Sequence, residues 1–287
     1  MKYLSGVERV EIRDSSLRDI QSDGWDELTK RTLHTFVMRH MINIDVNGLY
    51  CLLDSSINPL KNLEIYGTEF RLVDLDGTPP QLHVRTLLLH RTSFLNTLSD
   101  TTICPLVLSD ITSLNLTLSK LADFLHIRSA LTSGKLCSLT ELTIAHLPRS
   151  SQLLTDLTLD AQHALPVSQL RTLSIMFWDY RASLKIDLHL MNWWISNLTE
   201  NATPNLEHVT IHILFDRLAY LYSEHHDHTV WARFDAALAC PPVQVSRTLG
   251  DSTDWLMPLK RAIEQQMKML NDRGAVQVYI YGWHDDM

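Results

Sequence analysis

The sequence lacks clustered glycines. Only 9 glycines occur in 287 residues, and none of them forms the Gly-x-Gly start of a phosphate-binding loop. A Gly-x-Ser-x-Gly nucleophile elbow and a His-Glu-x-x-His zinc helix are absent as well. The local signatures of nucleotide-binding proteins, serine hydrolases and zinc peptidases are therefore missing. A catalytic triad built from distant residues leaves no local signature and stays open.

Cysteine and long apolar runs are also scarce. The 4 cysteines form no Cys-x-x-Cys pair and lie far apart, at Cys51, Cys104, Cys137 and Cys240. No run of about 18 apolar residues suggests a membrane span, and the opening MKYLSGVERVEI becomes charged too early for a signal peptide. We therefore expect reduced, mostly buried cysteines and an intracellular protein of the cytoplasm or nucleus.

Basic residues are in deficit. Lys and Arg number 25 against 33 Asp and Glu, which gives a formal net charge of -8 and argues against a nucleic-acid binder. The 45% hydrophobic and 20% charged residues are typical of a folded soluble domain. We expect no nucleic-acid or membrane partner. Three glycosylation acceptor strings carry little weight without an export signal; they begin at Asn115, Asn197 and Asn201.

What the chain does contain is a recurring phrase, Leu-x-x-Leu-x-Leu, seen clearly in SLTELTIAHL (138–147). The starts at residues 60, 84, 111 and 139 lie 24, 27 and 28 residues apart, within the range typical of leucine-rich repeats. The earlier gap of 53 is close to two such units, whereas later gaps of 15 and 16 are too short for a helical return. The phrases begin at Val7, Leu60, Val84, Ile111, Leu139, Leu154, Leu170 and Leu206.

Each phrase has the pattern of a short parallel strand. Its fourth and sixth residues point to one side because side chains alternate along a strand. Helical spacing of apolar residues predicts helices over 23–41, 46–56 and 118–134, the last one stopped by Gly134. Because no unit covers its own apolar face, neighbouring units must stack. The pattern predicts an α/β leucine-rich-repeat-like solenoid with strands on the inner face and helices on the outer face.

The C-terminal third departs from this rhythm. It predicts a helix beginning near Trp193 and Trp194, a short helix over 231–239, a strand in VQVSRTL, a helix over 254–272 and a final strand in VQVYIYGW. We expect one domain over 1–287, made of irregular repeats over 1–230 and an irregular C-terminal cap over 231–287.

The third, fifth and seventh positions of each phrase should face the concave strand surface. There they would form a mixed, polar and mildly acidic binding face that favours a neutral or basic protein partner. Two aromatic residues follow one strand and are candidate anchors, although core packing is the plainer interpretation. The predicted partner-binding residues are Glu141, Thr143, Asp156, Thr158, Thr172, Ser174, His208, Thr210, Trp178 and Tyr180.

One cluster of metal-ligand residue types stands out. SEHHDHTVW contains Glu224, His225, His226, Asp227 and His228, and two of these histidines would share one side of a strand. No zinc-motif spacing or distant Cys or His pair completes it, which favours a solvated loop. We predict no metal site, no cofactor and no catalytic residue. The rival interpretation is a metal-dependent hydrolase or another enzyme that uses this cluster.

The phrases also carry a family resemblance. NPLKNLEIYGTEF, PPQLHVRTLLLHRTSF, ITSLNLTLS and LCSLTELTIAHLP resemble the leucine-rich-repeat-like C-terminal region of fungal (basidiomycete-type) F-box proteins, and QLRTLSI, WARFDAAL and LNDRGAVQVYIY also fit it. The resemblance implies a non-enzymatic scaffold whose repeats bind a target for a ubiquitin ligase, while F-box helices bind the ligase adaptor.

The chain departs from that family at its start. An F-box opens with a Leu-Pro-x-Glu-like segment, whereas here Met1 is followed almost at once by the VERVEI phrase. We therefore expect the target-binding role without a recognisable F-box, and an adaptor contact only if an F-box is supplied elsewhere. A degenerate paralogue with no ligase activity also stays open.

Overall fold

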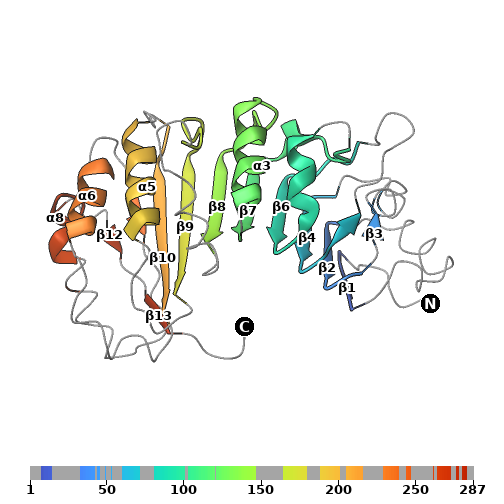
Figure 1. Ribbon diagram of the computed structural model, residues 1–287, viewed down its shortest axis with the longest axis horizontal. Helices are drawn as coiled ribbons and strands as arrows, with labels where there is room; N and C mark the ends of the chain where they lie inside the picture. The colour runs from blue at the N-terminus through green and yellow to red at the C-terminus, as the bar shows by residue number, and fades with distance from the viewer. Residues whose placement is uncertain are drawn as a thin grey trace. The chain divides into compact units, whose positions relative to one another are not determined.

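Figure 1 shows the computed structural model of the chain. The chain forms two compact units. Unit 1 comprises residues 1–117 and 122–139, and unit 2 comprises residues 118–121 and 140–287. The structure describes residues 8–14, 33–42, 44–45, 49, 53, 60–71, 81–100, 103–119, 121–146, 164–179, 188–200, 205–215, 229–238, 244–246, 261, 264–272, 276–277 and 280–282.

Unit 1 is built on a parallel sheet. Neighbouring strands pair in register, so that residues at the same position of successive phrases lie side by side. The strands follow the chain in the order β1 (Arg9–Arg13), β2 (Thr35–Arg39), β4 (Asn62–Tyr66), β6 (Thr86–His90) and β7 (Ser113–Leu118). Two short strands, β3 (Ile44–Asp45) and β5 (Phe70–Arg71), pair in parallel with each other.

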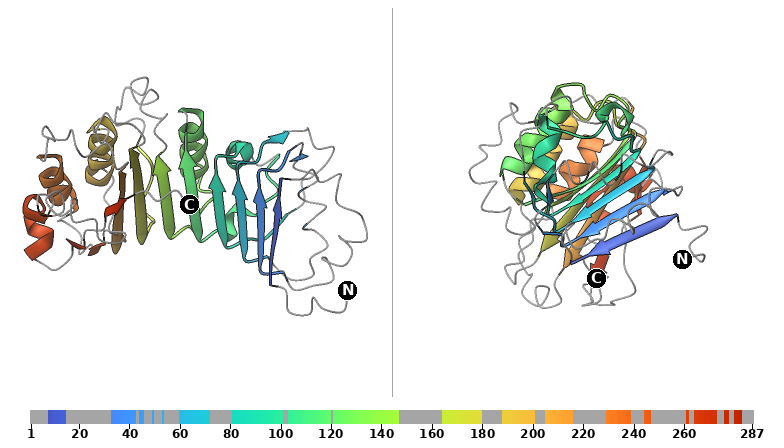
Figure 2. Two further views of the ribbon diagram at one scale, coloured as in Figure 1. Left: turned by 90° about the horizontal axis from the view of Figure 1, so that it is seen from below. Right: turned by 90° about the vertical axis from the view of Figure 1, so that its right-hand side faces the viewer.

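The core of unit 1 lies on one side of this sheet. Leu63, Ile65, Leu87 and Leu89 alternate along β4 and β6 with half-buried residues and are at most 2% exposed. The 3₁₀ helix η2 (Ser93–Ser99) and the helix α3 (Leu121–Thr132) lie on one face of the sheet (Figure 2). The apolar positions of the phrase thus build the core, as the strand alternation predicts.

A repeated backbone contact places each strand on the one before it. The carbonyl of Glu8 accepts the N–H groups of both His34 and Thr35, at 2.9 Å each. In the same way, the carbonyls of His34, Lys61 and Arg85 each accept two consecutive N–H groups at the start of the next strand. In unit 2 the carbonyls of Thr140 and Arg171 make the equivalent contact. The spacing of the phrases therefore has a direct physical counterpart: each phrase within the described ranges forms one strand that is bonded to its neighbours.

The prediction of a helix over 23–41 is wrong for residues 35–39, which form the strand β2. Leu33, Phe36 and Met38 form a further phrase, and all three are buried. Leu33 lies 26 residues after Val7 and 27 before Leu60, so this phrase divides the gap of 53. Val37, on the other side of the strand, is 0% exposed. A strand buried on both faces is continuously apolar, and such a run also fits helical spacing.

The same turn follows successive strands of unit 1. The residue after β1, β2, β4 and β6 has a left-handed backbone, with φ between 49° and 54° at Asp14, His40, Gly67 and Arg91. The N–H of Gly67 donates to the carbonyl of His90 at 2.8 Å, and Asp14 and His40 make the equivalent bond to the next strand. Only glycine adopts this conformation without steric cost.

Replacing Gly67 by alanine should destabilise unit 1 by about 1–2 kcal/mol. A Cβ at this position would meet Nδ1 of the His40 ring at 2.4 Å, and the left-handed backbone adds its own cost. Thermal or urea unfolding measures the change. Gly134→Ala is the matched control, because φ there is +70° but no atom lies within 4 Å of an added Cβ. This variant should lose only the stability that the left-handed backbone costs an alanine. Equal effects of the two variants would rule out the ring contact.

Unit 2 also consists of parallel strands with helices packed beside them. Its strands are β8 (Glu141–His146), β9 (Thr172–Asp179), β10 (His208–Phe215), β11 (Gln244–Ser246) and β12 (Val276–Gln277), and β13 (Ile280–Gly282) pairs with β10. The helices α5 (Leu188–Glu200) and α6 (Thr229–Leu238) pack against each other, and α8 (Lys268–Asp272) packs against α6. The side chain of Asp235 in α6 accepts the N–H of Met269 at 2.8 Å and so fixes the start of α8.

A buried polar pair joins the sheet of unit 2 to α5. The indole Nε1 of Trp194 donates to Nε2 of His146 at 3.0 Å, and Phe177 stacks on the same imidazole with ring centroids 6.1 Å apart. Trp194 is 0% and His146 is 6% exposed. Burial lowers the pKa of His146 to about 3. The ring is therefore neutral at physiological pH, which leaves Nε2 able to accept the indole proton.

Asn197, the start of one glycosylation acceptor string, is also part of this core. It is 1% exposed, and its amide accepts the N–H of Leu165 at 2.7 Å and donates to the carbonyl of Trp193 at 3.0 Å. Both polar atoms are used inside the protein. The folded chain therefore does not present this asparagine for modification.

Most of the remaining sequence predictions agree with the described elements. The helix over 118–134 is confirmed as α3, with Gly134 just after it, and the helix over 231–239 as α6. The helix at Trp193 and Trp194 is present as α5, but it begins at Leu188 and not near these two residues. The strand in VQVSRTL is β11, whereas VQVYIYGW is divided into β12 and β13. Part of the helix over 254–272 is present, interrupted at Met267. The phrase at Leu154 lies outside the described residues.

The chain is thus an α/β protein with parallel strands, as predicted. Its arrangement as a leucine-rich-repeat-like solenoid of a single domain with a cap stays a prediction. Cys104 is buried, but Cys137 is exposed, and both are free thiols. None of the helices in the described part of the chain is long and apolar enough to cross a membrane.

Candidate binding surface

The second face of the sheet in unit 1 is covered by none of the described helices (Figure 2). We call it the open face. It carries the third, fifth and seventh positions of each phrase, which the strand register aligns in rows. The first row is Arg9, Thr35, Asn62, Thr86 and Ser113; the second is Glu11, Val37, Glu64, Leu88 and Asn115; the third includes Arg13, Arg39, Tyr66 and His90.

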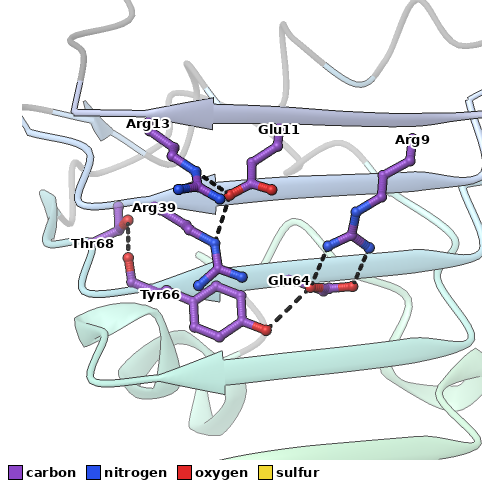
Figure 3. Close-up of polar contacts among 7 residues, drawn as sticks. All are labelled: Arg9, Glu11, Arg13, Arg39, Glu64, Tyr66 and Thr68. Atoms are coloured by element: carbon purple, nitrogen blue, oxygen red, sulfur yellow. Dashed lines mark hydrogen bonds and ion pairs between the residues drawn. The ribbon is translucent and has the colours of Figure 1, made fainter. Parts of the chain in front are cut away.

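A two-pronged ion pair crosses this face. Arg9 donates from Nη1 to Oε1 of Glu64 at 2.8 Å and from Nη2 to Oε2 at 3.1 Å, so it reaches from β1 over β2 to β4 (Figure 3). In the register Val37 lies between Glu11 and Glu64, and it is fully buried. The Glu64 carboxylate raises the pKa of Arg9. The pair uses both prongs of the Arg9 fork and leaves this side of the face close to neutral.

Two arginines share the other glutamate. Nε of Arg13 donates to Oε1 of Glu11, and Nε of Arg39 lies 2.7 Å from the same oxygen as an ion pair without hydrogen-bond geometry (Figure 3). The hydrogen bond from Arg13 is the main cause that lowers the pKa of Glu11, and Arg39 adds to it. One carboxylate thus faces two guanidinium groups.

The aromatic ring of Tyr66 supports Arg39. The guanidinium carbon of Arg39 lies 3.8 Å from the centre of the ring, which is a cation–π contact. The hydroxyl of Tyr66 donates to Oε2 of Glu64 at 3.2 Å. Burial, and then the Glu64 carboxylate, raise the pKa of Tyr66. The hydroxyl of Thr68 also donates to the backbone carbonyl of Tyr66 at 2.9 Å, which holds the backbone at this residue.

His90 continues the row beyond Tyr66. Their ring centroids are 5.9 Å apart, and Nδ1 of His90 lies 2.6 Å from the hydroxyl oxygen of Thr117. Burial lowers the pKa of His90 to about 4, and the positive charges of Arg91, Arg39 and His40 add to this effect. His90 is therefore neutral at physiological pH, and the guanidinium groups of Arg91 and Arg39 are among the causes of its low pKa.

An apolar side chain lies among these polar groups. Leu88 is half-buried on the open face, and in the register it lies between Glu64 and Asn115. Its neighbours in the strand, Leu87 and Leu89, point to the core. Aromatic and arginine anchors beside an accessible apolar group are the mixture typical of protein-binding hot spots.

Six of the residues predicted to bind a partner lie on one face of unit 2. The register places Glu141, Thr172 and His208 side by side, and Thr143, Ser174 and Thr210 in the next row. Glu141 and His208 are exposed, but Ser174 is only 9% exposed. The strand geometry that the sequence predicts is present here, and its binding role stays a prediction.

The other predicted residues are less well defined. Trp178 belongs to β9 without a described side chain, and Asp156, Thr158 and Tyr180 lie outside the described residues. The Glu224–His228 cluster lies outside them too. Within the described ranges, no group of three His, Cys, Asp or Glu side chains is close enough to hold a metal ion.

The cluster on unit 1 is not among the residues predicted from the sequence. Arg9 and Glu64 are 55 residues apart, and only the in-register alignment of β1, β2 and β4 brings them together. A signal was available: with Leu33 recognised as a phrase start, Arg9, Glu11, Arg39, Glu64 and Tyr66 all fall on outward positions.

No protein-family model, curated protein or solved structure matches the chain in the comparisons made with each.

Proposed function

We propose that the chain is a non-enzymatic protein-interaction scaffold that recognises a target through the strand face of its stacked phrases. The observation that carries the proposal is the composition of the open face of unit 1: an arginine stacked on a tyrosine and a half-buried leucine, held in register by successive strands. Such rigid aromatic, arginine and apolar anchors are common at protein interfaces. The sequence adds support because it contains no local catalytic signature.

In its finer form the proposal follows the family resemblance. The chain would act as the target-recognition part of a ubiquitin-ligase adaptor of the F-box type, arranged as a leucine-rich-repeat-like solenoid, with the F-box supplied elsewhere. The support for this form is the run of phrases in the sequence and their regular backbone contacts in both units.

A site-specific crosslinker tests the proposal. The photoreactive residue p-benzoylphenylalanine is placed at Leu88 on the open face or, as a matched control, at Ser129, which is exposed on α3. After irradiation in a cell extract we expect a discrete crosslinked protein from position 88, competed by excess unlabelled wild-type chain, and none from position 129. No competed product from position 88, or the same products from both positions, would contradict the proposal.

A further inference from the structure

Arg39 differs from Arg9 in how much of its hydrogen-bonding capacity is used. Both Nη groups of Arg9 bind Glu64. In the described part of the chain, neither Nη of Arg39 has an acceptor, and its buried Nε has an ion-pair contact but no hydrogen bond. Its side chain is still 30% exposed, so a partner can reach it.

The guanidinium of Arg39 is nevertheless held in place. Tyr66 supports one side of its plane, and Glu11 fixes its Nε end. An arginine held in this way loses little side-chain entropy when it binds, and its planar fork matches a carboxylate. The guanidinium is therefore fixed at its Nε end, while its two Nη groups have no acceptor among the described residues.

The charge around Arg39 has the sign that such a partner needs. Arg13 shares Glu11 with it, and Arg91 and His40 follow neighbouring strands closely enough to lower the pKa of His90. Glu11, and after it Asp14, are the carboxylates that raise the pKa of Arg13. The Glu64 carboxylate is already paired with Arg9. A positive potential thus remains at the end of the strands β2, β4 and β6.

We propose that Arg39, with Arg13 beside it, is the docking point for a carboxylate of an acidic segment in the protein partner. The inference rests on the proposed function and names the chemistry of its partner. It revises the expectation of a neutral or basic partner, because that expectation considered only the strands of unit 2. The planar guanidinium of Arg39 favours a side-chain or C-terminal carboxylate that binds both of its Nη groups.

The test uses the full chain and a random twelve-residue peptide library displayed on phage. Peptides selected on the wild type should be enriched in Asp and Glu. Synthetic copies should bind Arg39→Gln at least about tenfold more weakly, and Arg39→Lys should recover only part of the loss because it keeps the charge without the fork. Arg128→Gln on α3 is the control, and it should change the affinity less than about threefold because it removes the same charge away from the open face. Raising the ionic strength should weaken binding to the wild type.

Each contrary result has a distinct meaning. Selected peptides without acidic enrichment that lose affinity in Leu88→Gln but not in Arg39→Gln would overturn this inference and leave the proposed function standing. Peptides that bind all these variants equally, or no selected peptides at all, would contradict both. A preference for phosphoserine over glutamate at the same position would overturn the assignment of a carboxylate. Melting curves of each variant confirm that the fold is intact.

Discussion

Replacing Leu87 by glutamine should destabilise unit 1 by about 3–5 kcal/mol, whereas the same change at Leu88 should cost less than about 1 kcal/mol. Leu87 is 0% exposed, so the variant loses the burial of an apolar side chain and places an amide among leucines without a partner. Leu88 is half-buried on the open face, where an amide reaches water and the side chain of Asn115 lies alongside in the register.

Urea unfolding of the two variants measures the difference. Since whole domains are stable by only about 5–15 kcal/mol, Leu87→Gln is expected to shift the midpoint strongly or to abolish folding of unit 1. The pair is its own control, because the substitution is the same and the positions are adjacent. Similar losses at both positions would show that the two faces of β6 are not distinct, and would remove the basis of the open face.

The second large effect should come from acid. Burial lowers the pKa of His146 from 6.5 to about 3, so between these values the folded state binds fewer protons there than the unfolded state does. The contribution of His146 to the free energy of unfolding is therefore fully present above about pH 6.5 and is lost as the pH falls towards 3. The slope approaches about 1.4 kcal/mol per pH unit for this one group. Protonation also removes the acceptor of the indole N–H of Trp194.

His146→Gln isolates this contribution. Glutamine can still accept the indole proton but does not titrate, and the other histidines, His90 among them, remain in both proteins. We expect the free energy of unfolding of unit 2 to fall more steeply between pH 6.5 and 4 in the wild type than in the variant. Parallel pH profiles, followed by tryptophan fluorescence in urea, would show that His146 is not a buried neutral partner of Trp194.

The strands that could be predicted are those with a simple pattern. Phrases such as Leu63–Ile65 and Leu142–Ile144 alternate cleanly between buried and outward positions, and the structure has β4 and β8 there. Gly134 after α3 was equally clear because its left-handed backbone ends the helix. In each case a local pattern and the tertiary packing favour the same element.

The strand β2 was missed because its local pattern is ambiguous. Phe36, Val37 and Met38 are all buried, since one side faces the core and the other lies under the ion pairs of the open face. Such a run has no alternation to mark it as a strand. Only the distance of Leu33 from Val7 and Leu60 indicated a phrase, and spacing was the stronger signal there.

The candidate site was harder to predict because it depends on register. Arg39 meets Tyr66 and Glu11 because β2 lies between β1 and β4 with those residues side by side. An error in the assignment of β2 therefore hides the whole cluster. By contrast, the six described residues predicted on unit 2 come from strands that were recognised, and the register aligns them as expected.

The central claim is that the chain recognises a protein partner through the open face of unit 1. The most direct test is the affinity of the crosslinked partner, measured by isothermal titration calorimetry for the wild type, Leu88→Gln and the helix-face control Ser129→Gln. We predict binding at least about tenfold weaker for Leu88→Gln, with a melting temperature lowered by at most a few degrees, and wild-type affinity for Ser129→Gln. Wild-type affinity in a folded Leu88→Gln variant would contradict the claim.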